Sequence, residues 1–254
     1  MKSNTRLSYP IDQFAMFPPI IDAHTHVGSF GSWAQVACTG DQLLVEMDQF
    51  GVEKAIVFST DNHLVKDTVA RFPKRLVGYV WPNPYEPGSL DLVQTALRNW
   101  GFRGIKLHPL FHAFLPTDAV VEPFMEEARH SKVPVAIHSG HPPFSLPWSI
   151  GELAERYPDV RIVMLHMGHG HGVYIQAAIN TAKRYDNIIL ETSGMPMHTK
   201  IKEAVQKIGE QRVVYGSDIP FHHTSVELQR VKMADLSEHE LRLVLHDNAE
   251  LQLI

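Results

Sequence analysis

The chain has 254 residues and a formal net charge of −5, with 44% hydrophobic and 20% charged residues, so it can bury one large core. The acidic balance gives no general basic field for binding nucleic acid through its phosphates. No run of about 18 apolar residues is present, so we expect no membrane-spanning segment. The single cysteine, Cys38, cannot form an intramolecular disulfide, which fits a cytoplasmic protein.

Residues 1–19 precede the first clear strand pattern. They contain two basic residues but no apolar core of about 7–15 residues, so they are not typical of a secretory signal. We expect an N-terminal arm over residues 1–19 and a single domain over residues 20–254.

Short apolar runs rich in β-branched residues recur along the chain, with helical patterns between them. Eight such strands in about 250 residues are typical of an α/β fold of the (β/α)8 TIM-barrel class. A doubly wound open sheet is the alternative, but it gives no reason for polar residues to collect at the strand ends. The predicted strands are Ile20–His26, Lys54–Phe58, Leu76–Val80, Gly104–His108, Val135–His138, Arg161–His166, Ile188–Glu191 and Val213–Asp218.

Capping signals predict two of the helices. Asp41 can cap a helix over Gln42–Phe50 that ends at Gly51, and Ser237 with Glu240 forms a capping-box pattern that opens the last helix. The apolar residues at helical spacing in that last helix are Leu241, Val244, Leu245 and Leu251.

The distribution of the 16 histidines is the strongest functional signal. His24 and His26 lie two residues apart in a strand, so their side chains share a face and can share a metal ion. If the strand predictions hold, 13 histidines lie at C-terminal strand ends or in the loops that follow, which is the face where TIM barrels build active sites. Of the adjacent pair His222 and His223, at most one is expected to face the site. The remaining three, on helices, are His130, His239 and His246.

Small or slender residues lie one layer below several polar strand ends and would leave room for converging side chains. The residues predicted to share a face are Gly104, Lys106 and His108; Ala136 and His138; Met164 and His166; and Gly216 and Asp218.

Imidazole and carboxylate groups suit Zn²⁺, Mn²⁺ or Fe²⁺. We therefore expect one divalent ion with His24, His26, His138 and Asp218 as its ligands. Asp218 would also accept a proton from water activated by the ion, and His166 would polarise a carbonyl group or act as an acid.

Three further residues near this face have open roles. Lys106 and His108 are predicted to bind the substrate, and Lys106 suits a carboxylate group. Carbamylated Lys106 bridging two ions is an alternative. Asp22 lies deeper in the first strand, so we expect a supporting or structural role for it.

These motifs resemble those of the amidohydrolase superfamily, and more closely its amidohydrolase-related branch of metal-dependent TIM-barrel hydrolases. That branch includes the aminocarboxymuconate-semialdehyde decarboxylase-like enzymes. The matching segments follow the family's order over nearly the whole chain from residue 20. They are residues 21–26, 51–55, 104–109, 137–140, 165–168, 216–221 and 247–249.

The resemblance implies that His24, His26, His138 and Asp218 bind a divalent metal, commonly zinc, and that His166 is catalytic. Two segments depart from the family pattern. The arginine of the C-terminal Asn-Ala-x-Arg-Leu motif is missing from residues 248–252. The family's frequent Asp-Thr-Ser is Glu-Thr-Ser at residues 191–193.

The expected function is hydrolysis of a small amide, lactone or ester by metal-activated water. The alternative is non-oxidative decarboxylation of a small unsaturated or aromatic acid. A two-metal phosphoesterase or nuclease, and a non-enzymatic protein with a structural zinc, are weaker readings. We expect a small-molecule substrate, no nucleic-acid or membrane partner, and a cytoplasmic location, and the sequence is compatible with a homo-oligomer.

Overall fold

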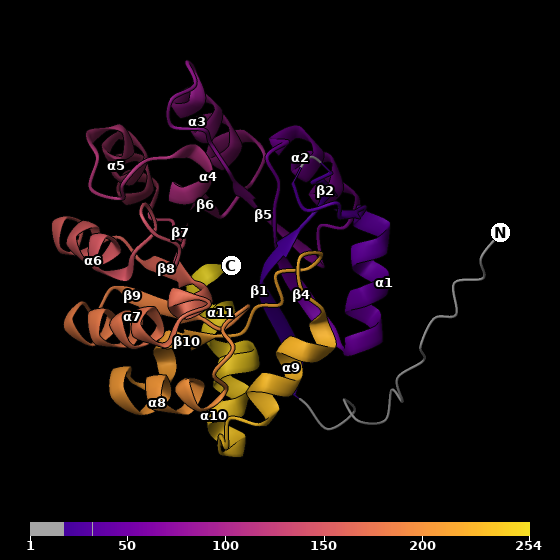
Figure 1. Cartoon of the computed structure of the whole chain (residues 1–254). Coiled ribbons are helices and arrows are strands. Elements are labelled where there is room, and N and C mark those ends of the chain that lie inside the picture. Colours follow the sequence, from indigo (N-terminus) through magenta and orange to yellow (C-terminus); the bar gives the residue numbers. More distant parts are fainter. Residues whose placement is uncertain (1–17, 32) are drawn as a thin grey trace.

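The eight apolar runs form eight parallel strands of one sheet in the computed structural model, which describes residues 18–31 and 33–254 (Figure 1). Neighbours pair in the order β1-β4-β5-β6-β7-β8-β9-β10, and a hairpin of β2 and β3 follows β1. The strands are β1 (Ile20–His26), β2 (Gly28–Ser29), β3 (Ala37–Cys38), β4 (Val52–Phe58), β5 (Leu76–Val80), β6 (Gly104–Leu107), β7 (Val135–His138), β8 (Ile162–Leu165), β9 (Ile188–Glu191) and β10 (Val213–Val214).

Helices connect the strands and surround the sheet, so the predicted TIM barrel is confirmed (Figure 1). No helix of the described residues is long and apolar enough to cross a membrane. The helices are α1 (Gly40–Phe50), α2 (Asn62–Arg71), α3 (Ser89–Asn99), α4 (Pro109–His112), η2 (Ala119–Val121), α5 (Glu122–Ser131), α6 (Pro147–Arg156), η3 (His166–Gly168), α7 (Gly172–Arg184), α8 (Thr199–Ile208), η4 (Glu210–Arg212), α9 (Thr224–Lys232), α10 (Glu238–Arg242), η5 (Leu243–Asp247) and α11 (Asn248–Leu253).

The segment after β10 closes the barrel against β1. The predicted strand Val213–Asp218 keeps regular geometry only over its first two residues: the Tyr215 N–H already donates to the Val244 carbonyl, and Asp218 has a left-handed φ of 56°. The chain still runs beside β1: the Ala23 N–H donates to the Tyr215 carbonyl at 3.0 Å, and the His26 N–H donates to the Ile219 carbonyl at 2.7 Å. Residues 215–219 therefore take the place of a longer last strand.

Two apolar clusters fill the barrel and its outer layer. The inner cluster draws residues from seven strands and from α11, whose Leu253 carbonyl accepts a hydrogen bond from Tyr79 Oη at 2.8 Å. Arg161, directly before β8, donates to the Gln252 carbonyl of the same helix at 3.1 Å. The last helix therefore covers the N-terminal end of the barrel and leaves the C-terminal end for the site.

The predicted alternation in β8 is wrong. Val163 and Leu165 belong to the inner cluster, whereas Met164 packs outward against the helices. His166 does not continue the strand: with a φ of 64° it begins the turn η3. This left-handed residue redirects the chain, so His166 reaches the barrel interior without sharing a face with Met164.

The predicted cap of α1 is also wrong, although the helix is present. Thr39 is the N-cap: its Oγ1 accepts the Gln42 N–H at 3.2 Å, and Gln42 Oε1 accepts the Thr39 N–H at 2.8 Å. Asp41 already lies inside the helix. Gly51, with a φ of 69°, ends the helix as predicted.

The capping box of Ser237 and Glu240 is confirmed at the start of α10. The helix that follows is interrupted by the π-helical turn η5, which shifts the helical spacing. Val244 and Leu245 are buried, but Leu251 is 80% exposed and does not share their buried face.

The predicted arm over residues 1–19 lies outside the described residues except for Pro18 and Pro19, which have no regular secondary structure.

Replacing Gly104 with alanine should destabilise the barrel. A Cβ at this position would collide with the buried Tyr79 ring. Overpacking of this kind costs about 1–3 kcal/mol. Urea unfolding should show this loss for Gly104→Ala, while Gly170→Ala, where a Cβ meets nothing within 4 Å, should unfold like the wild type. Equal stability of the two variants would contradict the packing described for Tyr79.

Candidate metal and substrate site

Three donor side chains converge at the C-terminal end of the barrel. His24 Nε2 and His26 Nε2 lie 3.1 Å apart, and Asp218 Oδ1 lies 3.3 Å and 3.1 Å from them. All three residues are at least nine-tenths buried. Ligand atoms about 2.0–2.2 Å from one ion lie about 3 Å from each other. The group therefore fits one divalent ion.

A shift in strand register and a buried carboxylate position this group. The pairing of β1 with β4 shifts between Asp22 and Thr25, just before the two histidines reach the cavity. Asp22 Oδ1 accepts the His24 N–H at 3.1 Å and the Ser217 N–H at 2.9 Å, which ties β1 to the segment carrying Asp218. Burial raises the pKa of Asp22 to about 7. These contacts support the structural role expected for Asp22.

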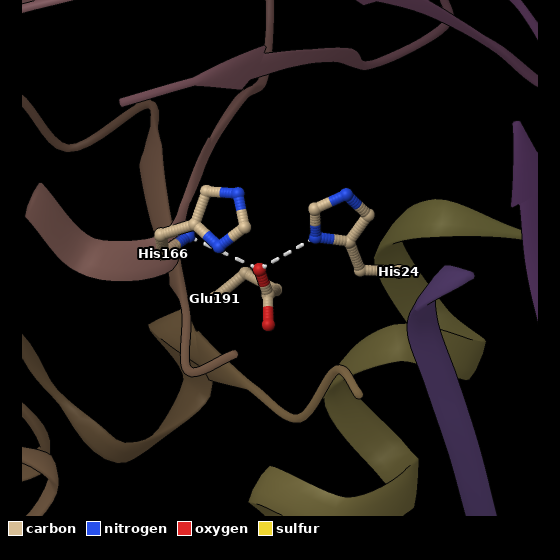
Figure 2. Close-up of side chains that lie close together, drawn as sticks. All are labelled: His24, His166 and Glu191. Atoms are coloured by element: carbon tan, nitrogen blue, oxygen red, sulfur yellow. Dashed lines mark hydrogen bonds and ion pairs between the residues drawn. The ribbon is translucent and has the colours of Figure 1, made fainter. Parts of the chain in front are cut away.

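A second donor group lies beneath the first. Glu191 Oε2 lies 3.1 Å from His24 Nδ1 and accepts the His166 N–H at 3.1 Å (Figure 2). It also accepts the Ser193 hydroxyl at 2.8 Å. Glu191 is fully buried and does not line the cavity, so this group is a supporting layer already engaged in hydrogen bonds.

Glu191 was missed as a site residue by the sequence analysis. Its position at the end of a predicted strand was the available signal, and the departure to Glu-Thr-Ser marked the same place. Gly216 explains how the side chain fits: a Cβ there would collide with Glu191 Oε1 and crowd His24 Cβ. Because Gly216 has no side chain, it leaves the space that the Glu191 carboxylate occupies.

The protonation states suit metal binding. Burial lowers the pKa of His24, His26 and His166, so these imidazoles are neutral near pH 7. Burial alone would raise the pKa of Asp218. Its hydrogen bond with His26 and the nearby His166 act more strongly in the opposite direction, so the pKa is lowered overall. Burial raises the pKa of Glu191 to about 8, although the hydrogen bonds that it accepts act to lower it.

His138 lies in the same cavity but outside the compact group. Its Nδ1 is 3.1 Å from His166 Nε2, and its Nε2 is 2.9 Å from His141 Nδ1. Its ring stacks on His108, with centroids 3.9 Å apart. The ligand role of His138 stays a prediction.

Lys106 lies buried at the floor of the cavity. Its Nζ is 3.4 Å from His24 Nε2 and lies over the rings of Phe58 and Trp81, at 5.0 Å and 5.8 Å from their centroids. Burial lowers its pKa to about 7, although Asp218 and Glu191 act in the opposite direction. Within residues 18–31 and 33–254, no carboxylate forms an ion pair with it.

His108 caps α4 instead of ending β6, which corrects the predicted strand Gly104–His108. Its Nδ1 accepts the Phe111 N–H at 3.1 Å, so a neutral His108 carries its proton on Nε2. The ring lies between Trp81 and His138.

The cavity above these groups has a volume of about 230 Å³. One wall is aromatic, and Trp33 stacks on Phe221 with centroids 5.1 Å apart. His222 lines the cavity and His223 does not, in agreement with the expectation for that pair. Five lining residues were given no role from the sequence: Trp33, Trp81, His141, His169 and Phe221.

An eight-stranded parallel barrel with histidine and carboxylate donors at this end belongs to the class of metal-dependent TIM-barrel enzymes. The family model described as Amidohydrolase matches residues 21–250, so the chain belongs to the amidohydrolase family, as the resemblance predicted. Comparison with curated protein sequences gives no significant match.

Three solved structures share this fold. A 5-carboxyvanillate decarboxylase from Novosphingobium aromaticivorans, complexed with manganese and 4-hydroxy-3-methoxy-5-nitrobenzoic acid, has a TM-score of 0.74 at 16% identity over 92% of this chain and 95% of its own. A dihydroxybenzoic acid decarboxylase from Polaromonas sp. JS666, with manganese and 2-nitroresorcinol, has a TM-score of 0.74 at 16% identity over 92% and 96%. A 2,6-dihydroxybenzoate decarboxylase from Rhizobium has a TM-score of 0.71 at 15% identity over 92% and 98%.

Removing a donor from the compact group should abolish metal binding. His24→Ala and Asp218→Ala should each weaken Mn²⁺ or Zn²⁺ binding by more than about 100-fold, because loss of a direct ligand exceeds the effect of outer contacts. Elemental analysis and calorimetric titration measure this loss. His130→Ala, on α5, is the matched control and should keep wild-type affinity. Wild-type metal content in His24→Ala would show that His24 is not a ligand and would contradict this metal site.

Proposed function

We propose that this enzyme is a metal-dependent, non-oxidative decarboxylase of a small aromatic or unsaturated carboxylic acid. This reading replaces hydrolysis as the leading function, because the similar structures described above are named as decarboxylases of aromatic acids. Within the chain, the observation that carries the proposal is the buried Lys106 amino group on the floor of an aromatic cavity, with no carboxylate partner among the described residues.

The buried charge of Lys106 favours an anionic substrate. Burying an ammonium group is costly unless an anion or several hydrogen bonds compensate it. The contacts of Lys106 are an imidazole and two ring faces, which compensate only in part. A substrate carboxylate beside Lys106 would supply the missing charge.

The aromatic wall favours a flat substrate. Trp81, Trp33 and Phe221 present ring surfaces to the cavity, and flat unsaturated groups pack well on such faces. The volume of about 230 Å³ is below the range of about 300–1,000 Å³ for drug-sized ligands. The substrate is therefore a compact acid, with a body about the size of one ring.

The metal set of the proposal is His24, His26 and Asp218, with His138 as the fourth ligand. A bound divalent ion would supply positive charge to the oxygens of the substrate. Imidazole and carboxylate ligands accept both zinc and manganese, so the donor set does not select one of them.

The remaining groups handle the substrate and the proton. The Nε2–H of His108 would donate to a substrate oxygen. When the bond to the carboxylate carbon breaks, CO₂ leaves, the electron pair stays on the substrate carbon, and a proton must be added there. His166 and Asp218 both line the cavity and are the residues that would hold and deliver that proton.

Decarboxylation should be detected as CO₂ release from a panel of hydroxybenzoates and short unsaturated acids, using protein loaded with Mn²⁺ or Zn²⁺. The buried cation and the aromatic wall are the physical reason for choosing flat acids. Amides, lactones and esters of similar size form the parallel panel. Turnover of that second panel without CO₂ release from the first would favour hydrolysis and overturn the proposal.

Replacing Lys106 with methionine should weaken use of the acid substrate. Loss of a charge-assisted contact costs about 1.5–3 kcal/mol, so kcat/KM should fall about 10- to 100-fold, mainly through a higher KM. Lys132→Met, at the exposed end of α5, is the control and should leave both constants unchanged. An unchanged KM in Lys106→Met would exclude a carboxylate contact with Lys106.

A further inference from the structure

We propose that Glu191, together with Ser193, is a positioning residue pair that fixes which ring nitrogen carries the proton in His24, His166 and His138. The pair would thereby direct the Nε2 lone pairs of His24 and His138 toward ligand positions. This inference rests on the metal site proposed above, and it assigns a role to a segment that the proposed reaction does not use.

Glu191 fixes the position of the ring proton in His24. Its Nδ1 faces Glu191 Oε2 at 3.1 Å (Figure 2). Oε2 already accepts the His166 N–H and the Ser193 hydroxyl, so this oxygen faces His24 as an acceptor too. Nδ1 therefore carries the hydrogen, and in a neutral imidazole the other nitrogen keeps its lone pair. That other atom, Nε2, is the one that lies 3.1 Å from His26 and 3.3 Å from Asp218.

Backbone hydrogen bonds hold the Glu191 carboxylate in place. Glu191 Oε2 accepts the His166 backbone N–H, and Oε1 accepts the Ser193 backbone N–H. A backbone N–H can only donate, so both oxygens must act as acceptors. Gly216 leaves the space that Oε1 occupies, and Glu191 has no exposed surface. The carboxylate therefore has one orientation.

The position of the ring proton in His138 is fixed through His166. The Ser193 carbonyl lies 3.1 Å from His166 Nδ1, and a carbonyl can only accept, so His166 is protonated on Nδ1. Its Nε2 must then accept, and the atom facing it at 3.1 Å is His138 Nδ1. His138 thus donates from Nδ1 and keeps the lone pair on Nε2, the form that binds a metal.

The test is Glu191→Gln, which keeps the shape of the side chain. Whichever way the amide is turned, its NH₂ group faces a backbone N–H, from Ser193 on one side or His166 on the other. We expect Mn²⁺ to bind about 10- to 100-fold more weakly by calorimetry. In the metal-free protein, ¹⁵N NMR of the imidazole rings should show that His24 loses its single Nδ1–H form.

The matched control is Thr192→Val, a buried neighbour on the same strand end. Its hydroxyl has no hydrogen-bond partner among the described residues, so Mn²⁺ affinity and tautomers should stay at wild-type values. Ser193→Ala keeps the backbone carbonyl and loses only the hydroxyl. It should shift the affinity in the same direction as Glu191→Gln by a smaller factor, and it tests the inference if Glu191→Gln does not fold.

Wild-type affinity and unchanged tautomers in a folded Glu191→Gln protein would overturn the inference. A crystal structure of the Mn²⁺-loaded wild type with the ion bound to Glu191 would also overturn it, because the residue would then be a ligand. If the wild type binds no divalent ion, the proposed metal site fails. The imidazole tautomers of the metal-free protein would still decide the role of Glu191.

Discussion

The pairing between β1 and the segment after β10 is the interaction on which the site depends. It brings the first and last strands of the chain together, and with them His24, His26 and Asp218. The Asp218 N–H donates to the His24 carbonyl at 2.7 Å, so the backbone holds the carboxylate beside the imidazoles before any ion is bound. Closing the barrel and assembling the donor group are therefore one event, although the residues are almost 200 positions apart in the chain.

The barrel end buries several ionisable groups that would be unfavourable one at a time. Asp22 is compensated by two backbone N–H donors, and Glu191 by backbone and hydroxyl donors. Asp218 faces imidazoles on the cavity side. Lys106 is the exception, since no carboxylate reaches it within the described part of the chain. The carboxylates are thus compensated within the site, whereas Lys106 is left without a carboxylate partner among the described residues.

The sequence predicted the barrel and the proximity of His24, His26 and Asp218 because both follow from strand patterns. Alternation within a strand places His24 and His26 together, and strand ends of a barrel share one face. It failed where the backbone leaves the regular form. The left-handed residues His166 and Asp218, the register shift near Asp22 and the π-helical turn η5 depend on tertiary contacts that no local pattern encodes. Glu191 was missed because its partners come from β1 and η3.

The three levels of the site differ in what can change without disturbing the donor group. The lowest level, around Glu191, is fixed by backbone donors and by the space above Gly216. The donor group above it is fixed by the closure of the barrel. The upper wall comes from side chains on separate loops, among them Trp33 and Phe221, and loops tolerate substitution more readily than strand ends. In the proposed enzyme, the wall and Lys106 would therefore set substrate choice, and with it decarboxylation or hydrolysis, over a donor group that suits either reaction.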